Sequence, residues 1–190
     1  VLETPKKSRI TLKGKAMSVR ERIARSALVM QDVNSQLFTD SVEEELLLAW
    51  KGRSRREKTA GETREKAAEE AAQREIDTLL QALGLAECKE RHPMSLSGGQ
   101  KQRISIARGL LKPFEVLILD DSLSAVDMNT DLKINNALKS MDRKFTSIII
   151  SHRISTIANC DNIIVMDDGK IVESGKHNEL IKKNGIYSKI

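Results

Sequence analysis

The sequence predicts an α/β fold in which a parallel sheet carries an inserted helical segment. In the second half of the chain, helix and strand patterns alternate in the order 101–111, 115–119, 128–141, 146–150, 154–159 and 162–166. Such alternation is typical of parallel strands joined by crossover helices. Between residues 41 and 94 the composition favours helices without a strand. The length of 190 residues suits one domain with one core.

The first part of the chain, residues 1–40, is expected to contribute the beginning of the sheet. Residues 9–12 alternate between polar and apolar and predict a short strand before a turn. Ser18 and Glu21 have the spacing of a capping box, which predicts a short helix starting there. The apolar residues 27–30 predict a buried strand that leads into Gln31.

The second part, residues 41–95, is expected to be a helical subdomain. Three acids follow Ser41, where they suit the positive end of a helix. Residues 62–83 are mostly strong helix formers, and Gly84 is expected to end that helix. In the third part, residues 96–190, Asp168-Gly169 predicts a hairpin turn near the end of the chain.

Composition excludes some functional classes. Aromatic residues make up 3% of the chain, which leaves little for base stacking, so we expect no nucleic-acid partner despite the net charge of +5. Cys88 and Cys160 lack metal-ligand spacing and suggest a reducing compartment. The apolar runs are too short to cross a bilayer, so a membrane role is expected to come through a partner or a missing segment.

The most specific motif is a pair of glycines at the start of a helix pattern. The run is Leu96-Ser97-Gly98-Gly99-Gln100. Adjacent glycines let the backbone approach a ligand, and the first turn of a helix presents unpaired N–H groups and a positive dipole end to phosphate. Taken alone, Ser-Gly-Gly is more often a simple glycine-rich helix entry, but the helical pattern here continues through Arg108.

Two acids follow a strand pattern, and two further polar residues follow other strand patterns. Residues 116–119 predict a fully buried strand that ends in Asp120 and Asp121. Carboxylates at the carboxyl end of a parallel strand lie where ligands of open α/β sheets bind, and Asp120 is a candidate ligand of Mg²⁺. His152 follows the apolar residues 148–150, as Gln31 follows its own strand. Each pattern alone is more often an ordinary strand end.

Together, and in this order, the motifs resemble the ATP-binding (nucleotide-binding) domain of ABC transporters over nearly the whole chain. The resemblance implies a P-loop NTPase-type parallel sheet with an inserted α-helical subdomain, and ATP and Mg²⁺ as cofactors. It also implies a second nucleotide-binding domain, identical or in a heterodimer, a transmembrane partner, and a place at the cytoplasmic face of the cell membrane.

The resemblance assigns roles to residues. The nucleotide-binding signature is Ser97, Gly98, Gly99 and Gln100. Ser124 and Asp127 correspond to the D-loop, although Asp127 also suits the N-cap of a helix beginning at residue 128.

In the same family pattern, Asp120 holds Mg²⁺ and Asp121 stands at the catalytic position. His152 corresponds to the switch histidine that hydrogen-bonds the terminal phosphate. Gln31 corresponds to the Q-loop glutamine, which senses Mg²⁺ and the attacking water and links to the membrane partner.

The sequence departs from the family in two places. No Gly-x-x-x-x-Gly-Lys-Ser/Thr phosphate loop occurs in it, and since this loop is expected before Gln31, the chain is expected to begin just after it. Asp121 stands where most members have Glu, and its side chain is shorter by one C–C bond, about 1.5 Å. We therefore expect an ABC-type ATPase that is inactive as an isolated chain.

Two questions stay open at this point. Residues 29–48 look most like energy-coupling-factor ATPases, whereas the chain from Ile104 onward looks like multidrug-type exporters, so a divergent lineage and a fusion of two genes both stay open, as does the direction of transport. The alternative function is a catalytically degenerate module that lends its signature to another ATPase domain. A soluble ABC ATPase of DNA repair or translation would carry long coiled-coil or tandem-domain insertions, which the sequence does not show.

Overall fold

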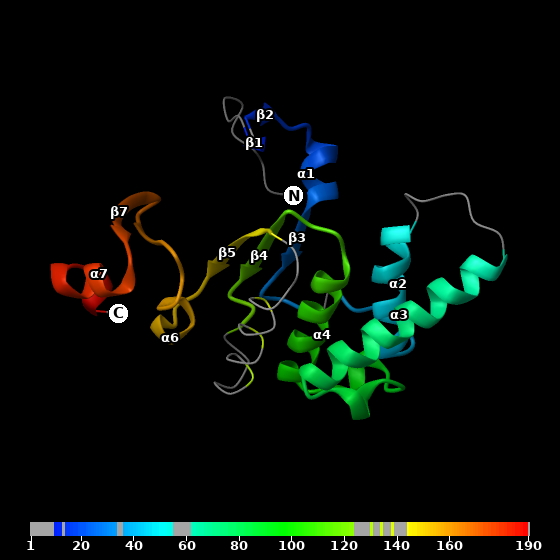
Figure 1. The fold of residues 1–190 in the computed structure, drawn as a ribbon. Coiled ribbons are helices and arrows are strands. Elements are labelled where there is room, and N and C mark those ends of the chain that lie inside the picture. The colour runs from blue at the N-terminus through cyan, green and yellow to red at the C-terminus, as the bar shows by residue number, and fades with distance from the viewer. Residues whose placement is uncertain are drawn as a thin grey trace.

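A sheet of three parallel strands forms the centre of the molecule (Figure 1). The computed structural model describes residues 10–12, 14–33, 36–54, 62–123, 130, 134, 138 and 144–189. The strands, in sheet order, are β3 (Ser26–Val29), β4 (Val116–Asp120) and β5 (Thr146–Ile150). Both pairings are parallel, which confirms the predicted α/β class.

The segment before the sheet forms a hairpin and a short helix. Strands β1 (Thr11–Leu12) and β2 (Lys15–Ala16) pair antiparallel, and α1 spans Val19–Arg25. The predicted capping box is present, since the Ser18 amide donates to Glu21 Oε2 at 2.9 Å and the Glu21 amide donates to Ser18 Oγ at 3.3 Å. The bond from the Ser18 amide lowers the pKa of Glu21.

The predicted helical subdomain contains two helices, α2 (Val42–Ser54) and α3 (Glu62–Ala82), and two 3₁₀ turns, η1 (Ala86–Cys88) and η2 (Pro93–Ser95). Gly84 has a φ of +64°, as its predicted role at the end of α3 requires. Arg103 Nη1 donates to Leu83 O at 2.9 Å and satisfies a carbonyl there. Lys89 binds Asp77 of α3 and Glu43 of α2, and the hydrogen bond to Asp77 raises the pKa of Lys89.

Helix α4 (Gly98–Leu111) joins this subdomain to the sheet. A Cβ at Gly109 would lie 3.0 Å from Val29 Cγ2, so the helix backbone packs closely on β3. Ile104 and Ile106 of α4 are fully buried in the same cluster as Leu117 and Leu119 of β4.

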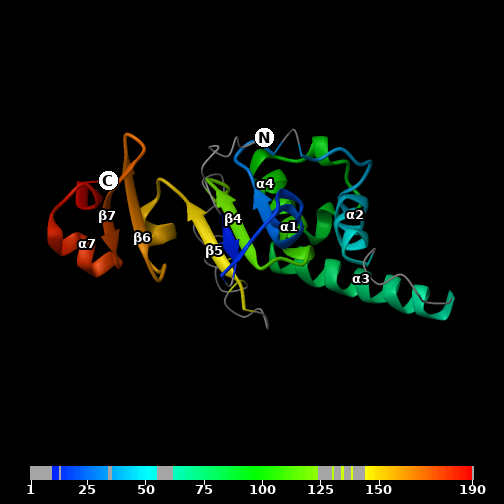
Figure 2. The same ribbon diagram turned by 90° about the horizontal axis from the view of Figure 1, so that it is seen from above.

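The end of the chain forms a separate unit beyond β5, on the side away from α2, α3 and α4 (Figure 2). We call residues 163–189 the C-terminal unit. It contains β6 (Ile163–Asp167), β7 (Lys170–Gly175), α7 (His177–Lys183) and η3 (Tyr187–Lys189). The short helix α6 (Ile154–Ile157) precedes it. The predicted hairpin is confirmed, because β6 and β7 pair antiparallel and Asp168 and Gly169 both have positive φ.

One expectation about the sheet is wrong. The sequence predicts buried strands, but Ile148 and Ile150 of β5 are 47% and 49% exposed, and Leu28 of β3 is exposed too. Leu28, Ile118 and Ile148 are register partners and share one face of the sheet, while α4 covers the opposite face. The described elements therefore bury one face of this sheet only.

The helix expected at residues 128–141 lies largely outside the described residues. Among the helices that are described, none has the length and apolar character needed to span a bilayer.

Candidate functional site

The structure brings the three predicted strand ends to one edge of the sheet. Gln31 follows β3, Asp120 ends β4, and His152 follows β5. Because β4 is the central strand, its end lies between the other two. The Asp121 amide donates to Ile150 O at 2.9 Å, so the pairing of β4 with β5 continues up to the predicted site.

Gln31 and Asp121 are in direct contact, although 90 positions separate them. Gln31 Nε2 donates to Asp121 Oδ2 at 3.3 Å. Asp121 has a φ of +43°, in the left-handed region that Asp tolerates better than most residues. The chain therefore turns sharply after β4, and the Asp121 side chain meets the amide that follows β3.

His152 is exposed at the end of β5. The residue after it is held in place, since the Arg153 amide donates to Ser151 Oγ at 3.0 Å and Arg153 Nη1 contacts Leu123 O at 3.4 Å. The imidazole is thus carried by an anchored loop at the same edge as Gln31 and Asp121.

The donors at this edge suit Mg²⁺. Asp120 and Asp121 supply carboxylate oxygens and Gln31 supplies an amide oxygen, which are the hard ligands that this ion prefers. Among the described residues, no three His, Cys, Asp or Glu side chains gather as a metal site. Mg²⁺ usually binds through one or two carboxylates together with substrate phosphates and water, so the donor set fits an ion that arrives with a nucleotide.

The predicted signature forms the first turn of α4. Ser97 is the N-cap: its Oγ accepts from the Gln100 amide at 3.3 Å, and its amide donates to Gln100 Oε1 at 2.9 Å. Gln100 is turned back, with Nε2 3.5 Å from Cys88 Sγ. The helix-entry interpretation is therefore correct as far as it goes, and the Ser97 hydroxyl retains its proton for a ligand.

The same turn is open to an approaching phosphate. Ser97 and Gly98 are exposed, and a Cβ at Gly98 would meet no atom within 4 Å. With the free N–H groups and the positive dipole end of α4, this geometry fits a phosphate. The D-loop positions Ser124 and Asp127 lie outside the described residues.

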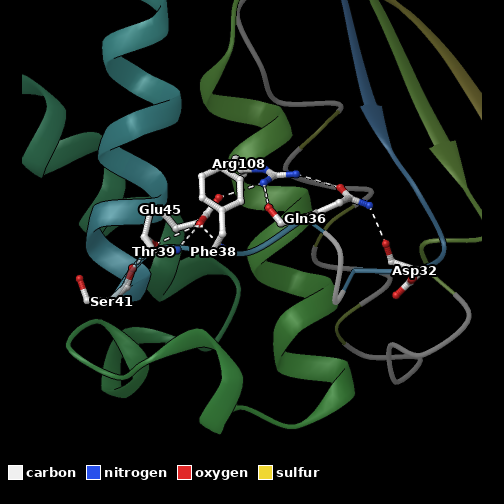
Figure 3. A network of polar contacts seen from close by, with 7 residues as sticks. All are labelled: Asp32, Gln36, Phe38, Thr39, Ser41, Glu45 and Arg108. Carbon is white, nitrogen blue, oxygen red and sulfur yellow. Dashed lines mark hydrogen bonds and ion pairs between the residues drawn. The ribbon is translucent and has the colours of Figure 1, made fainter. Parts of the chain in front are cut away.

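The motifs did not reveal a buried polar cluster between α2 and α4 (Figure 3). Glu45 is 1% exposed and pairs with Arg108 at 2.9 Å. Arg108 also donates to the side chain and the carbonyl of Gln36. A signal was available, because Glu45 lies on the helix face of the buried residues Val42 and Ala49.

A pocket of about 220 Å³ lies beside this cluster. Its lining residues are Phe38, Glu45, Leu48, Ala49, Arg108 and Lys112. Burial lowers the pKa of Lys112, the Arg108 charge lowers it further, and the Glu45 carboxylate offsets part of this shift. Phe38 is 72% exposed and Leu48 is half exposed, so apolar surface is open at the rim.

Comparison with known proteins agrees with this geometry. A family model described as "ABC transporter" matches residues 1–124. An ATP-dependent lipid A-core flippase of Photorhabdus laumondii is 42% identical over 176 residues, which are 93% of this chain and 28% of the relative. The flippase of Vibrio vulnificus strain CMCP6 is 40% identical over 164 residues, 86% of this chain and 27% of the relative.

A solved structure is similar over almost the whole chain. It is described as a bacterial Atm1-family ABC exporter with ATP bound, and it superposes with a TM-score of 0.79 at 28% identity. The match covers 98% of this chain and 32% of the exporter. The chain thus spans less than a third of these relatives.

Proposed function

This chain belongs to the ABC transporter family, and we propose that it is the ATP-binding part of a transporter that couples nucleotide binding and hydrolysis to transport. The observation that carries the proposal is the joint placement of Gln31 and Asp121 at the sheet edge, with the open signature turn at Gly98. The edge offers oxygen ligands and the turn offers amides, which are the two groups that a magnesium nucleotide requires.

Each proposed residue has a defined task. Ser97, Gly98 and Gly99, with Gln100 as the cap partner of Ser97, would hold the phosphates of a nucleotide seated on a second nucleotide-binding domain. Exposure of Ser97 and Gly98 supports this, because a partner can reach them without rearrangement.

At the sheet edge, Asp120 would hold Mg²⁺, which supplies charge neutralisation of the phosphates when bound. Gln31 orients the Asp121 carboxylate through the hydrogen bond between them. His152 would donate a hydrogen bond to the terminal phosphate.

In the assembled transporter, we expect slow hydrolysis at the sheet edge of this chain. An Asp at position 121 is about 1.5 Å shorter than Glu, and a general base must come within roughly 2.6–3.2 Å of its proton. The hydrogen bond from Gln31 also holds the carboxylate at the sheet edge. The printed sequence contains no phosphate-loop motif, so the proposed sandwich takes that loop from another segment or chain.

The transmembrane partner is proposed to contact the pocket rimmed by Phe38 and Leu48. Exposed apolar side chains around a pocket are more favourably covered by a protein partner than by water. This partner would place the chain at the cytoplasmic face of the membrane. Since the relatives are named lipid A-core flippases, we propose a lipid as cargo.

The test is photolabelling of the transporter assembled from this chain and its partners, with a photoactivatable ATP analogue. We expect label at the Ser97–Gly98 turn in the wild type and loss of label in Gly98→Leu. Because a side chain at Gly98 meets open space, the variant should unfold at the wild-type temperature. Thr78→Leu, on the exposed face of α3, is the control and should keep the label. Wild-type complexes in which this turn is never labelled would contradict the proposal.

A second candidate is a degenerate module that lends its signature to another ATPase domain. The short Asp121 side chain favours it. The two candidates differ in ATP turnover at the edge of this chain's own sheet: Asp121→Asn in the assembled transporter lowers turnover if that edge hydrolyses ATP and leaves it unchanged if it does not.

A further inference from the structure

The polar cluster between α2 and α4 reaches from Asp32 at one end to Phe38 at the other (Figure 3), and Phe38 also lines the pocket. At one end, Gln36 Nε2 donates to the carbonyl of Asp32, the residue after Gln31, at 2.8 Å. Gln36 Oε1 accepts from Arg108 Nη2 at 2.9 Å. The loop next to Gln31 is therefore connected to the second half of α4.

At the other end, Glu45 holds the pocket rim. Its Oε2 accepts from the amides of Phe38 and Thr39, at 3.1 Å and 3.3 Å, and from Thr39 Oγ1 at 3.0 Å. Its Oε1 accepts from Arg108 Nη1 at 2.9 Å. Arg108 is the residue common to both ends, because its planar guanidinium donates in several directions at once.

Burial makes this arrangement rigid. The Glu45 side chain is 1% exposed and that of Arg108 is 19% exposed, so water screens the pair poorly. A buried carboxylate without its cation would be costly, so the position of Arg108 determines where residues 36–39 lie. A movement of the pocket rim at Phe38 would therefore shift Arg108, and through it Gln36 and Asp32.

From these contacts we infer that Arg108 is a positioning residue, which makes the placement of Gln31 depend on what occupies the Phe38 pocket. The inference rests on the proposed function, in which Gln31 orients Asp121 and the pocket takes the transmembrane partner. Arg108 contacts Gln36 and Glu45, and it would act on Gln31 through Gln36 and the backbone of Asp32.

The decisive variant replaces both charges, Arg108→Met with Glu45→Met. Replacing a buried ion pair by apolar residues of similar volume is often neutral for stability, so we expect a melting temperature within about 4 °C of the wild type. The amides of Phe38 and Thr39 lose their acceptor. Their hydrogen exchange in the 190-residue chain should become roughly tenfold faster, as expected for the loss of one hydrogen bond.

In the assembled transporter, the same variant should lower kcat for ATP on the order of tenfold and change KM less than about threefold, since small misplacement of an orienting group affects the chemical step most. Arg108→Lys keeps the charge but loses the forked guanidinium donors, so its kcat should lie between those of the wild type and the double variant. The matched control is Arg25→Met with Glu115→Met, an exposed Arg–Glu pair elsewhere. This control should change neither kcat nor the hydrogen exchange of the Phe38 and Thr39 amides.

The outcomes distinguish a failure of the Arg108 coupling from a failure of the proposed function. Wild-type exchange at Phe38 and Thr39 in the double variant, or a wild-type kcat, overturns the inference. A fall in kcat that only follows the loss of folded protein also overturns it. If the wild-type complex never labels at Ser97, the proposed function fails, whereas the exchange measurement still decides, in the chain alone, whether Arg108 and Glu45 hold the rim.

Discussion

The sheet with its helices and the C-terminal unit are held together by different forces. In the first region, α4 seals one face of the sheet, and Ile104, Leu117 and Leu119 are completely buried. In the C-terminal unit, the buried apolar cluster consists of Ile163, Val165, Leu180 and Tyr187.

Hydrogen bonds supplement this small core. Glu173 accepts from the amides of Ile186 and Tyr187, at 2.6 Å and 3.1 Å, and thereby fastens η3 to β7. The Tyr187 hydroxyl lies 2.8 Å from His177 Nδ1 of α7. Apolar burial therefore dominates in the region with the candidate site, whereas the unit beyond it combines a small apolar core with a few polar contacts.

The largest effect should follow a change in the apolar region. Leu117→Ala removes a fully buried side chain from the central strand and should lower the free energy of unfolding by about 2–5 kcal/mol. Chemical denaturation measures this loss. Leu28→Ala on β3, where the side chain is exposed, should cost less than about 1 kcal/mol. Equal losses at the two positions would mean that α4 does not create the difference between the two faces of the sheet.

A smaller and local effect is expected in the C-terminal unit. Glu173→Gln removes the charge that strengthens two hydrogen bonds and should cost about 1–3 kcal/mol. Hydrogen exchange at Ile186 and Tyr187 should become faster while β3 and β4 stay protected. Glu87→Gln, at an exposed position of η1, serves as the control. Faster exchange throughout the sheet would show that the two regions unfold together.

The smallest effect concerns alkaline pH. Burial raises the pKa of the Tyr187 phenol, with a further contribution from Cys160. The folded state thus favours the protonated phenol, so this stabilisation is complete below the unfolded pKa of about 10 and is lost as pH rises through the folded pKa, at no more than about 1.4 kcal/mol per pH unit. Tyr187 is the sole tyrosine of the chain, so phenolate absorbance reports it alone.

We expect the C-terminal unit to open above about pH 10 before the sheet does, and Tyr187→Phe to remove the part of this dependence that comes from the phenol. Ionisation of Tyr187 at an ordinary pKa, with no opening, would argue against its burial.

Much of the candidate site was predictable because parallel strands end at the same edge. The strand patterns, together with the resemblance to ABC ATP-binding domains, predicted Gln31, Asp120 and His152 as site residues, and the structure places each of them at the carboxyl end of a strand of one parallel sheet. The direct hydrogen bond from Gln31 to Asp121 was not predictable, since it depends on the left-handed turn at Asp121. The cluster around Arg108 was missed, because sequence spacing gives Glu45 no partner 63 positions away.

The sequence by itself determined the local features: the capping boxes at Ser18 and Ser97, the end of α3 at Gly84, and the hairpin at Asp168-Gly169. These depend on hydrogen bonds and backbone angles within a few residues. Only the tertiary structure decided which apolar strand faces stay exposed and which charged side chains are buried. Both depend on which distant element packs against a given face, and an apolar strand such as β5 has the same pattern whether its neighbour is a helix or solvent.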